Sequence, residues 1–219
     1  MSTTTLILGE SGTGKTASLR NMNPAETLLL QVVKKPLPFR SEGWGYFDKD
    51  KNPAGNIMMT DNWQQIIALS GRTKRPVIVI DDFQYLLANE FMRRSDETGF
   101  AKFTEIGKHT WEVLQAINAL PDGVRVYIPW HTDISESGKT KAKTIGKLLD
   151  EKITIEGLFT IVLRTAVMDG QYLFSTRNNG SDTVKTPMGL FADDYIENDL
   201  AKIDAEICAY YGINSAKAA

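Results

Sequence analysis

The stretch of sequence that decides the fold lies near the amino terminus and reads Thr4-Thr5-Leu6-Ile7-Leu8-Gly9-Glu10-Ser11-Gly12-Thr13-Gly14-Lys15-Thr16. Its first five residues are apolar or β-favouring and predict a short buried strand. The remaining eight match the pattern G-x-x-x-x-G-K-[ST], and residues 15–22 can continue as a helix. A strand, a glycine-rich loop and a helix in this order predict a phosphate-binding loop within an α/β domain.

The residue types in this loop have a mechanical basis. Its glycines let the backbone curl so that consecutive N–H groups point at phosphate oxygens. Lys15 is then expected to contact the β- and γ-phosphates, and the Thr16 hydroxyl to coordinate Mg²⁺. The alternative is a glycine-rich turn with an incidental lysine. The residues predicted to bind ATP with magnesium are Gly9, Glu10, Ser11, Gly12, Thr13, Gly14, Lys15 and Thr16.

Composition places the chain among ordinary globular proteins. It has 219 residues, of which 42% are hydrophobic and 24% charged, so we expect one P-loop ATPase domain over residues 1–219. A net charge of −2 argues against a basic coat for nucleic acid, so any polyanion site must be local. One cysteine and two histidines exclude a disulfide framework and a Cys/His metal cluster. With no apolar run near the roughly 18 residues of a membrane span, and no signal-like start, we expect a cytoplasmic protein without membrane contact.

The rest of the chain alternates strand and helix patterns. Apolar runs predict strands at 27–33, 76–80 and 124–130, and amphipathic patterns predict helices at 61–71, 83–93 and 103–117. Runs at 158–167 and 171–176 flank Asp169-Gly170, a strong hairpin signal, and residues 194–211 predict a closing helix. Residues 34–56 and 132–147 read as irregular, the second as a mobile loop. The pattern predicts a three-layer α/β fold with a mostly parallel sheet, a late antiparallel hairpin and a C-terminal helix.

Two adjacent aspartates end the strand predicted at 76–80. Asp81 lies 65 residues after Thr16, where a second carboxylate is expected to approach magnesium as the Walker B aspartate. Asp82 is a candidate general base that polarises the attacking water, and the alternative is a cap on the helix that begins at Phe83. The strand at 27–33, between the two motifs, is typical of the additional-strand ATPases, which include RecA-like and AAA-type proteins.

Other polar side chains have two interpretations each. His131 follows the strand at 124–130, where such ATPases place a catalytic sensor of the γ-phosphate; a histidine satisfied by backbone is the alternative. His109 lies in an amphipathic helix and is expected to be structural. Arg164 and Arg177 are either fingers that reach a neighbouring subunit's γ-phosphate or ordinary surface arginines.

Two segments could contact nucleic acid. The tentative DNA-binding residues are Lys139, Lys141, Lys143 and Lys147, in the polar segment after His131, and the alternative is a solvated loop. The excursion at 34–51 interleaves basic residues with aromatic ones, although those aromatics favour anchoring of the loop to the core. These residues are Lys34, Lys35, Arg40, Trp44, Tyr46 and Phe47.

The chain as a whole resembles phage-encoded RecA-like P-loop ATPases, a group that includes single-strand annealing recombinases and phage nucleotide-binding proteins. The resemblance covers most of the chain and rests on five features. They are the phosphate loop, Lys35-Pro36-Leu37-Pro38-Phe39, the strand ending in Asp81-Asp82 with Phe83-Gln84-Tyr85, His131, and Thr186-Pro187-Met188-Gly189-Leu190-Phe191. One feature departs from it, because no residue here matches the catalytic glutamate of RecA.

The resemblance implies a RecA-like core, binding of ATP and Mg²⁺, and ATP hydrolysis that is weak or stimulated by DNA. It also implies action in phage DNA recombination or single-strand annealing in the host cytoplasm. The expected partners are single-stranded DNA, a single-strand-binding protein and further copies of the chain. The competing hypothesis is an AAA-like remodelling or accessory ATPase that acts on protein partners without DNA.

Overall fold

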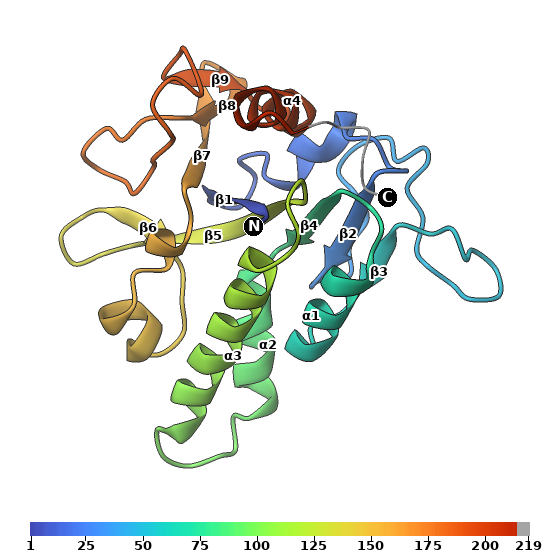
Figure 1. The fold of residues 1–219 in the computed structure, drawn as a ribbon. Helices are drawn as coiled ribbons and strands as arrows, with labels where there is room; N and C mark the ends of the chain where they lie inside the picture. Colours follow the sequence, from blue (N-terminus) through green and yellow to red (C-terminus); the bar gives the residue numbers. More distant parts are fainter. Residues whose placement is uncertain (214–219) are drawn as a thin grey trace.

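The computed structural model describes residues 1–213, which form one mixed β-sheet with helices on both faces (Figure 1). The strands are β1 (Thr3–Gly9), β2 (Thr27–Gln31), β3 (Ile57–Met59), β4 (Val77–Asp81), β5 (Arg125–Ile134), β6 (Thr140–Ala142), β7 (Ile161–Met168), β8 (Gln171–Ser175) and β9 (Tyr195–Glu197). The helices are α1 (Trp63–Arg72), α2 (Gln84–Arg93), α3 (Ala101–Asn118) and α4 (Leu200–Tyr211), with short helical segments η1 (Thr16–Asn21), η2 (Leu148–Lys152) and η3 (Ile155–Leu158).

The sheet is parallel through its centre and antiparallel at one end. Its strand order is β3-β2-β4-β5-β1-β7-β8-β9, with β6 paired to β5 alone. All neighbours from β3 to β7 run parallel, whereas β8 is antiparallel to both β7 and β9. The predicted α/β class, mostly parallel sheet, late hairpin and C-terminal helix are therefore confirmed.

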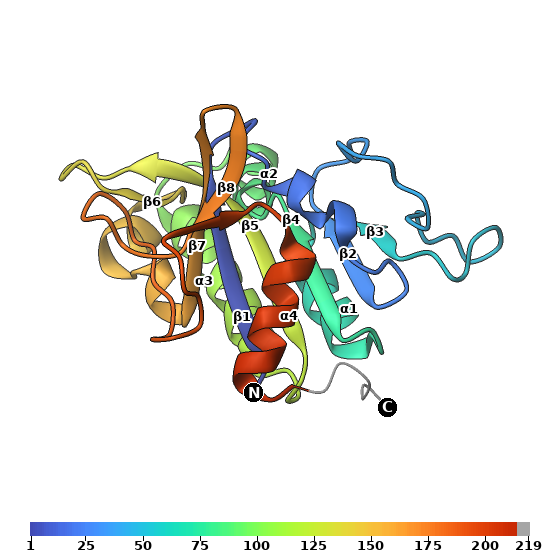
Figure 2. The ribbon, with the colours of Figure 1, turned by 90° about the horizontal axis from the view of Figure 1, so that it is seen from above.

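The central strands are apolar on both sides because both faces of the sheet are covered. Helices α1, α2 and α3 lie on one face, and α4 lies across the other (Figure 2). Alternate side chains point to opposite faces, so Leu6 and Leu8 of β1 pack in the core with α1–α3, while Ile7 packs in the core with α4. Each such fully buried aliphatic side chain stabilises the fold by about 1.5–3 kcal/mol.

The strand between β1 and β4 is β5. The sequence places residues 27–33 between the phosphate loop and Asp81, but the strand formed there, β2, pairs on the far side of β4. The strand that separates β1 from β4 in the sheet is instead β5, which comes later in the chain than both.

Three segments differ from their expected structure. The expected helix at 15–22 is a short 3₁₀ turn, η1, because the Ser18 hydroxyl donates to the Lys15 carbonyl at 2.6 Å and Pro24 closes the segment. The expected mobile loop at 132–147 instead continues β5 to Ile134 and returns as β6. The closing helix begins only at Leu200, because residues 195–197 first add the edge strand β9.

Candidate functional site

A pocket of about 540 Å³ opens at the carboxyl ends of the central parallel strands. Parallel strands in register end at the same edge, and here Gly9 lies opposite His131 and Gln31 opposite Asp81. Open α/β sheets bind ligands at this edge. The pocket is lined by Ser11, Gly12, Gly14, Lys15, Thr16, Ala17, Val33, Lys35, Pro36, Pro38, Asp82, Tyr85, His131 and Tyr172. A cavity of about 690 Å³ lies at the opposite edge, around the start of β4, and contains none of the predicted site residues.

The glycines of the phosphate loop meet two different constraints. Gly12 and Gly14 have φ of 80° and 96°, a region that side chains with a Cβ rarely adopt. At Gly9 the constraint is space, since a Cβ there would lie 1.9 Å from the Thr165 hydroxyl of β7. The same hydroxyl lies 2.6 Å from that of Thr13, so β7 holds the loop in its curled form.

Lys15 is drawn into the loop rather than left in solvent. Its ammonium donates to the carbonyls of Gly9 at 2.8 Å and Glu10 at 2.7 Å, and the residue is 6% exposed. Burial lowers the pKa of Lys15 to about 8, although Asp82 and Asp81 oppose this shift. A buried cation held by neutral carbonyls, next to open space, is poised to exchange them for an anion.

The Thr16 hydroxyl connects the phosphate loop to β4. It lies 3.0 Å from each carboxylate oxygen of Asp81, which is 1% exposed. Burial, and then the neighbouring Asp82, raise the pKa of Asp81 to about 6. Mg²⁺ prefers oxygen ligands of this type, commonly one or two protein groups together with substrate phosphates. Thr16 and Asp81 thus fit the magnesium site expected from the sequence.

Asp82 occupies a strained position at the centre of the pocket. Its φ is 58°, in the left-handed region, and it is 2% exposed. Its carboxylate forms an ion pair with Lys35 and lies 3.5 Å from Nε2 of His131. Burial raises the pKa of Asp82, but the bonds with His131 and Lys35 outweigh it and lower the pKa overall. The alternative role of Asp82 as a side-chain cap does not apply, since Phe83 occupies the N-cap position of α2 and no side chain caps that helix.

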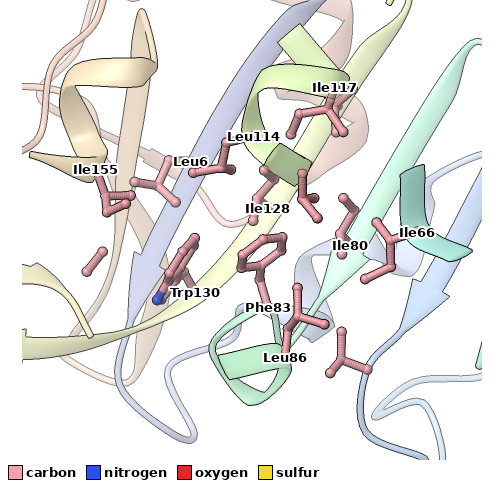
Figure 3. Packing of buried hydrophobic residues seen from close by; sticks show 14 of the residues in the cluster. Leu6, Ile66, Ile80, Phe83, Leu86, Leu114, Ile117, Ile128, Trp130 and Ile155 are labelled. Atoms are coloured by element: carbon pink, nitrogen blue, oxygen red, sulfur yellow. The ribbon is translucent and has the colours of Figure 1, made fainter. Parts of the chain in front are cut away.

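The core beneath the pocket fixes Asp82 and His131. Phe83 follows the first and Trp130 precedes the second, and their buried rings stack with centroids 4.5 Å apart (Figure 3). The Phe83 N–H also donates to the Pro129 carbonyl at 3.1 Å. Above them, Tyr85 meets the His131 ring edge to face at 5.7 Å. Packing at native density leaves such side chains little freedom.

A second cavity, of about 510 Å³, adjoins the phosphate-loop pocket. Ala17 and Tyr172 line both cavities, and Tyr172 is 51% exposed. On its wall lies Asn198, which is 2% exposed and whose Nδ2 has no hydrogen-bond partner within residues 1–213. The other residues that line this cavity are Arg20, Gln171, Leu173 and Glu197.

Sequence reasoning did not identify Tyr172, Asn198 or Thr165 as parts of the site. Each comes from the strands β7–β9 or the residue that follows them, and no local motif marks it. The sequence marks Lys35 only as part of a basic excursion. Most aromatics of that excursion act as anchors, because Phe39 and Trp44 pack on the core and the Tyr46 hydroxyl donates to Gln31 at 2.7 Å, whereas Phe47 is exposed.

The four lysines predicted to contact DNA lie on and beyond the β5–β6 hairpin, and acidic residues engage two of them. Lys141 pairs with Asp150, and Lys147 lies 3.6 Å from Glu151. Lys139 and Lys143 are exposed. The hairpin therefore presents fewer free cations than its sequence indicates.

The remaining candidates have partners within the chain. Arg164 lies 3.4 Å from Asp182, and Arg177 lies 2.7 Å from Asp194, which favours ordinary arginines over fingers for another subunit. His109 stacks on Trp63 at 4.6 Å and is structural, as expected.

Comparison with known proteins does not assign the chain to a family. A scan of the chain against models of protein families gives no match, and a search of curated proteins gives none either. Among the helices of residues 1–213, none is long and apolar enough to cross a bilayer.

Proposed function

We propose that this protein binds ATP with magnesium and hydrolyses it slowly. The observation that carries the proposal is the contact of Thr16 with both oxygens of Asp81, two residues far apart in sequence. This contact brings the phosphate loop and the Asp81 carboxylate, a suitable ligand for Mg²⁺, together beside the buried Lys15. Mg²⁺ at this position would neutralise charge that develops on the transferred phosphoryl group.

The adjoining cavity supports a nucleotide rather than a bare phosphate as ligand. A triphosphate on the loop would direct its nucleoside past Ala17 and Tyr172, the two residues that line both cavities. Tyr172 offers a half-exposed ring on which a base can stack. Asn198 supplies a buried amide for which the base or ribose is a suitable partner.

The neighbourhood of Asp82 supports hydrolysis. Its carboxylate lies 3.5 Å from the His131 imidazole in the lining of the pocket, as a base and a polar partner for an attacking water would. In the ligand-free arrangement the carboxylate is engaged by Lys35, which supports a low basal rate.

We extend the proposal to a RecA-like ATPase of phage that acts in DNA recombination or single-strand annealing. The support is a sheet in which β5 separates the phosphate-loop strand from the strand ending in Asp81, and exposed lysines on a hairpin that continues from His131. The protein would work in the host cytoplasm as a homo-oligomer on single-stranded DNA, with a single-strand-binding protein. The acidic partners of Lys141 and Lys147 favour the second candidate, an AAA-like ATPase that acts on proteins.

ATP hydrolysis by the parent and by Asp82→Asn, each with and without single-stranded DNA, tests the proposal. The parent should hydrolyse ATP faster with DNA, and Asp82→Asn should be about 100-fold slower while it still binds ATP. Equal rates in parent and variant would show that Asp82 is not the general base. A parent whose rate ignores DNA at low salt would favour the protein-directed candidate.

A further inference from the structure

A second lysine faces the phosphate-loop pocket, on the wall opposite the loop. Lys35 follows β2 and extends its side chain to Asp82, with which it pairs. Its side chain is 41% exposed, whereas that of Asp82 is 4% exposed, so the ammonium covers the carboxylate from the open side of the pocket. Lys15, by contrast, is held within the loop by two carbonyls.

The backbone around Lys35 is fixed, so the fold sets the point from which its side chain extends into the pocket. The Lys35 carbonyl accepts from the Gln31 side chain at 3.3 Å, and Gln31 in turn accepts from the Tyr46 hydroxyl at 2.7 Å. Pro36 restricts Lys35 to extended conformations and has a fixed φ itself. The long excursion that begins here is thus tied to β2 directly behind the lysine.

The two walls of the pocket suit different phosphates. The curled backbone of the loop suits the α- and β-phosphates, and Lys15 reaches the β- and γ-phosphates from that side. The far wall carries Asp82, Lys35 and His131. In a triphosphate held by the loop, the third phosphate is the one expected to approach this wall. A γ-phosphate beside an uncovered Asp82 would meet a like charge, and at about 4 Å this repulsion is several times stronger near a protein than in bulk water.

We propose that Lys35 is a γ-phosphate-binding residue, which turns from Asp82 to the third phosphate and makes the site select nucleoside triphosphates over diphosphates. This inference rests on the proposed function. The Lys35 ammonium stays paired with an anion throughout, because it leaves the Asp82 carboxylate as it meets the third phosphate. With the ammonium on the third phosphate, its positive charge offsets the repulsion between that phosphate and Asp82. The Asp82 carboxylate is then available as a base only when a triphosphate is present, so Lys35 couples occupancy of the site to the availability of its base.

The test compares the affinities of Mg-ATP and Mg-ADP by calorimetry for the parent, Lys35→Ala, Lys35→Arg and Lys34→Ala. Lys34 is the matched control, because it is the adjacent lysine, is exposed and lies outside the pocket lining. Lys35→Ala should lower the affinity for ATP by about 10- to 100-fold, the scale of one charge-assisted hydrogen bond. Its affinity for ADP should stay within about 3-fold of the parent's. Lys35→Arg should restore part of the preference, and Lys34→Ala should match the parent.

Three results would overturn the inference in distinguishable ways. If Lys35→Ala loses affinity for ATP and ADP equally and also melts earlier, Lys35 is a structural residue. If its ATP-to-ADP ratio equals that of the parent, Lys35 does not contact the third phosphate. If the parent itself binds neither nucleotide, the proposed function fails first and the inference falls with it.

Discussion

Asp81 illustrates how the candidate site opposes the stability of the ligand-free fold. The residue is buried next to a second carboxylate, and the raised pKa means that its charged form is disfavoured in the folded protein. Functional sites commonly hold such unfavourable charge until a ligand compensates it. The cost should be measurable as stability that depends on pH.

Asp81→Asn should stabilise the ligand-free protein at pH 7 by about 1–3 kcal/mol, since a tenfold change in a protonation equilibrium corresponds to about 1.4 kcal/mol. The folded-state pKa of about 6 lies above the ordinary value of 3.8, so the parent's deficit is full above pH 6 and disappears as the pH falls toward 4. Urea unfolding with EDTA at several pH values measures this difference. Asp133→Asn, an exposed carboxylate, should show no such trend. If the parent is as stable as Asp81→Asn at pH 7, the Asp81 charge does not destabilise the ligand-free fold and the prediction is wrong.

The sequence predicts the polar centre of the site well. The phosphate loop carries its own pattern, and Asp81, Asp82 and His131 follow apolar runs whose parallel register brings them to one edge of the sheet. The sequence could not predict Lys35 as a partner of Asp82, because this contact depends on where a long excursion leaves β2. The sequence could not predict Tyr172 as a pocket residue either, because its place in the lining depends on where the β7–β8 hairpin lies at the end of the sheet.

Among the elements, the hairpin formed by β5 and β6 is the one that distinguishes a DNA-directed ATPase from a protein-directed one. Its strand β5 passes through His131 before it leaves the sheet. The Trp130 indole donates to the Lys143 carbonyl at 2.7 Å, so the returning strand is tied to the core beside the site. A ligand that grips the hairpin would therefore act on the segment that holds His131.

Replacing Lys139 and Lys143 together by Ala should weaken the salt dependence of single-strand binding, because these two are the exposed, unengaged lysines of the four. We expect the log–log slope to decrease by about 1.4, at roughly 0.7 per phosphate contact. Fluorescence anisotropy of a labelled oligonucleotide across a salt series, with ATP present, measures the slope. Lys74→Ala with Lys185→Ala, two exposed lysines in other parts of the chain, is the matched control. Equal slopes in the two double variants would exclude the hairpin from DNA contact.

Secondary structure is predictable from the sequence where burial leaves a clear pattern, which is a continuous apolar run in a central strand or an amphipathic repeat in a helix. The buried strands β1, β2 and β4 and the amphipathic helices α1 to α3 lie close to their expected ranges. The hairpin strand β6 and the edge strand β9 have three residues each, too few for their sequences to carry an apolar pattern. The helix expected after the phosphate loop is shortened to η1 by local hydrogen bonding and the nearby proline.

At the scale of the whole molecule, one buried ion pair fastens the C-terminal helix to the sheet. Arg125 of β5 donates from Nε and Nη2 to the two carboxylate oxygens of Asp204 in α4, both at 2.9 Å. The Tyr127 hydroxyl donates to the same carboxylate. Arg125 is 2% exposed, so its charge has no access to water if the carboxylate is removed. No sequence pattern pairs residues so far apart.

Asp204→Ala should therefore destabilise the protein by about 3–5 kcal/mol, the range for leaving a buried charge without its partner. Urea unfolding measures the loss, and Glu206→Ala is the control, as an exposed acid on the same helix. ATP affinity at low temperature should be unchanged, because the pair lies away from the pocket lining. A loss below about 1 kcal/mol would show that α4 is held by its apolar face alone.

The measurement that tests the central claim most directly is calorimetric titration of Mg-ATP into the parent and into Lys15→Ala. The parent should bind one equivalent of ATP per chain. Lys15→Ala should bind at least about 10-fold more weakly, since a buried cation among converging N–H groups is lost from beside a polyanion. Its melting temperature should not fall, because burial already disfavours the Lys15 charge in the empty site. Equal affinities, or no binding to the folded parent, would contradict the account.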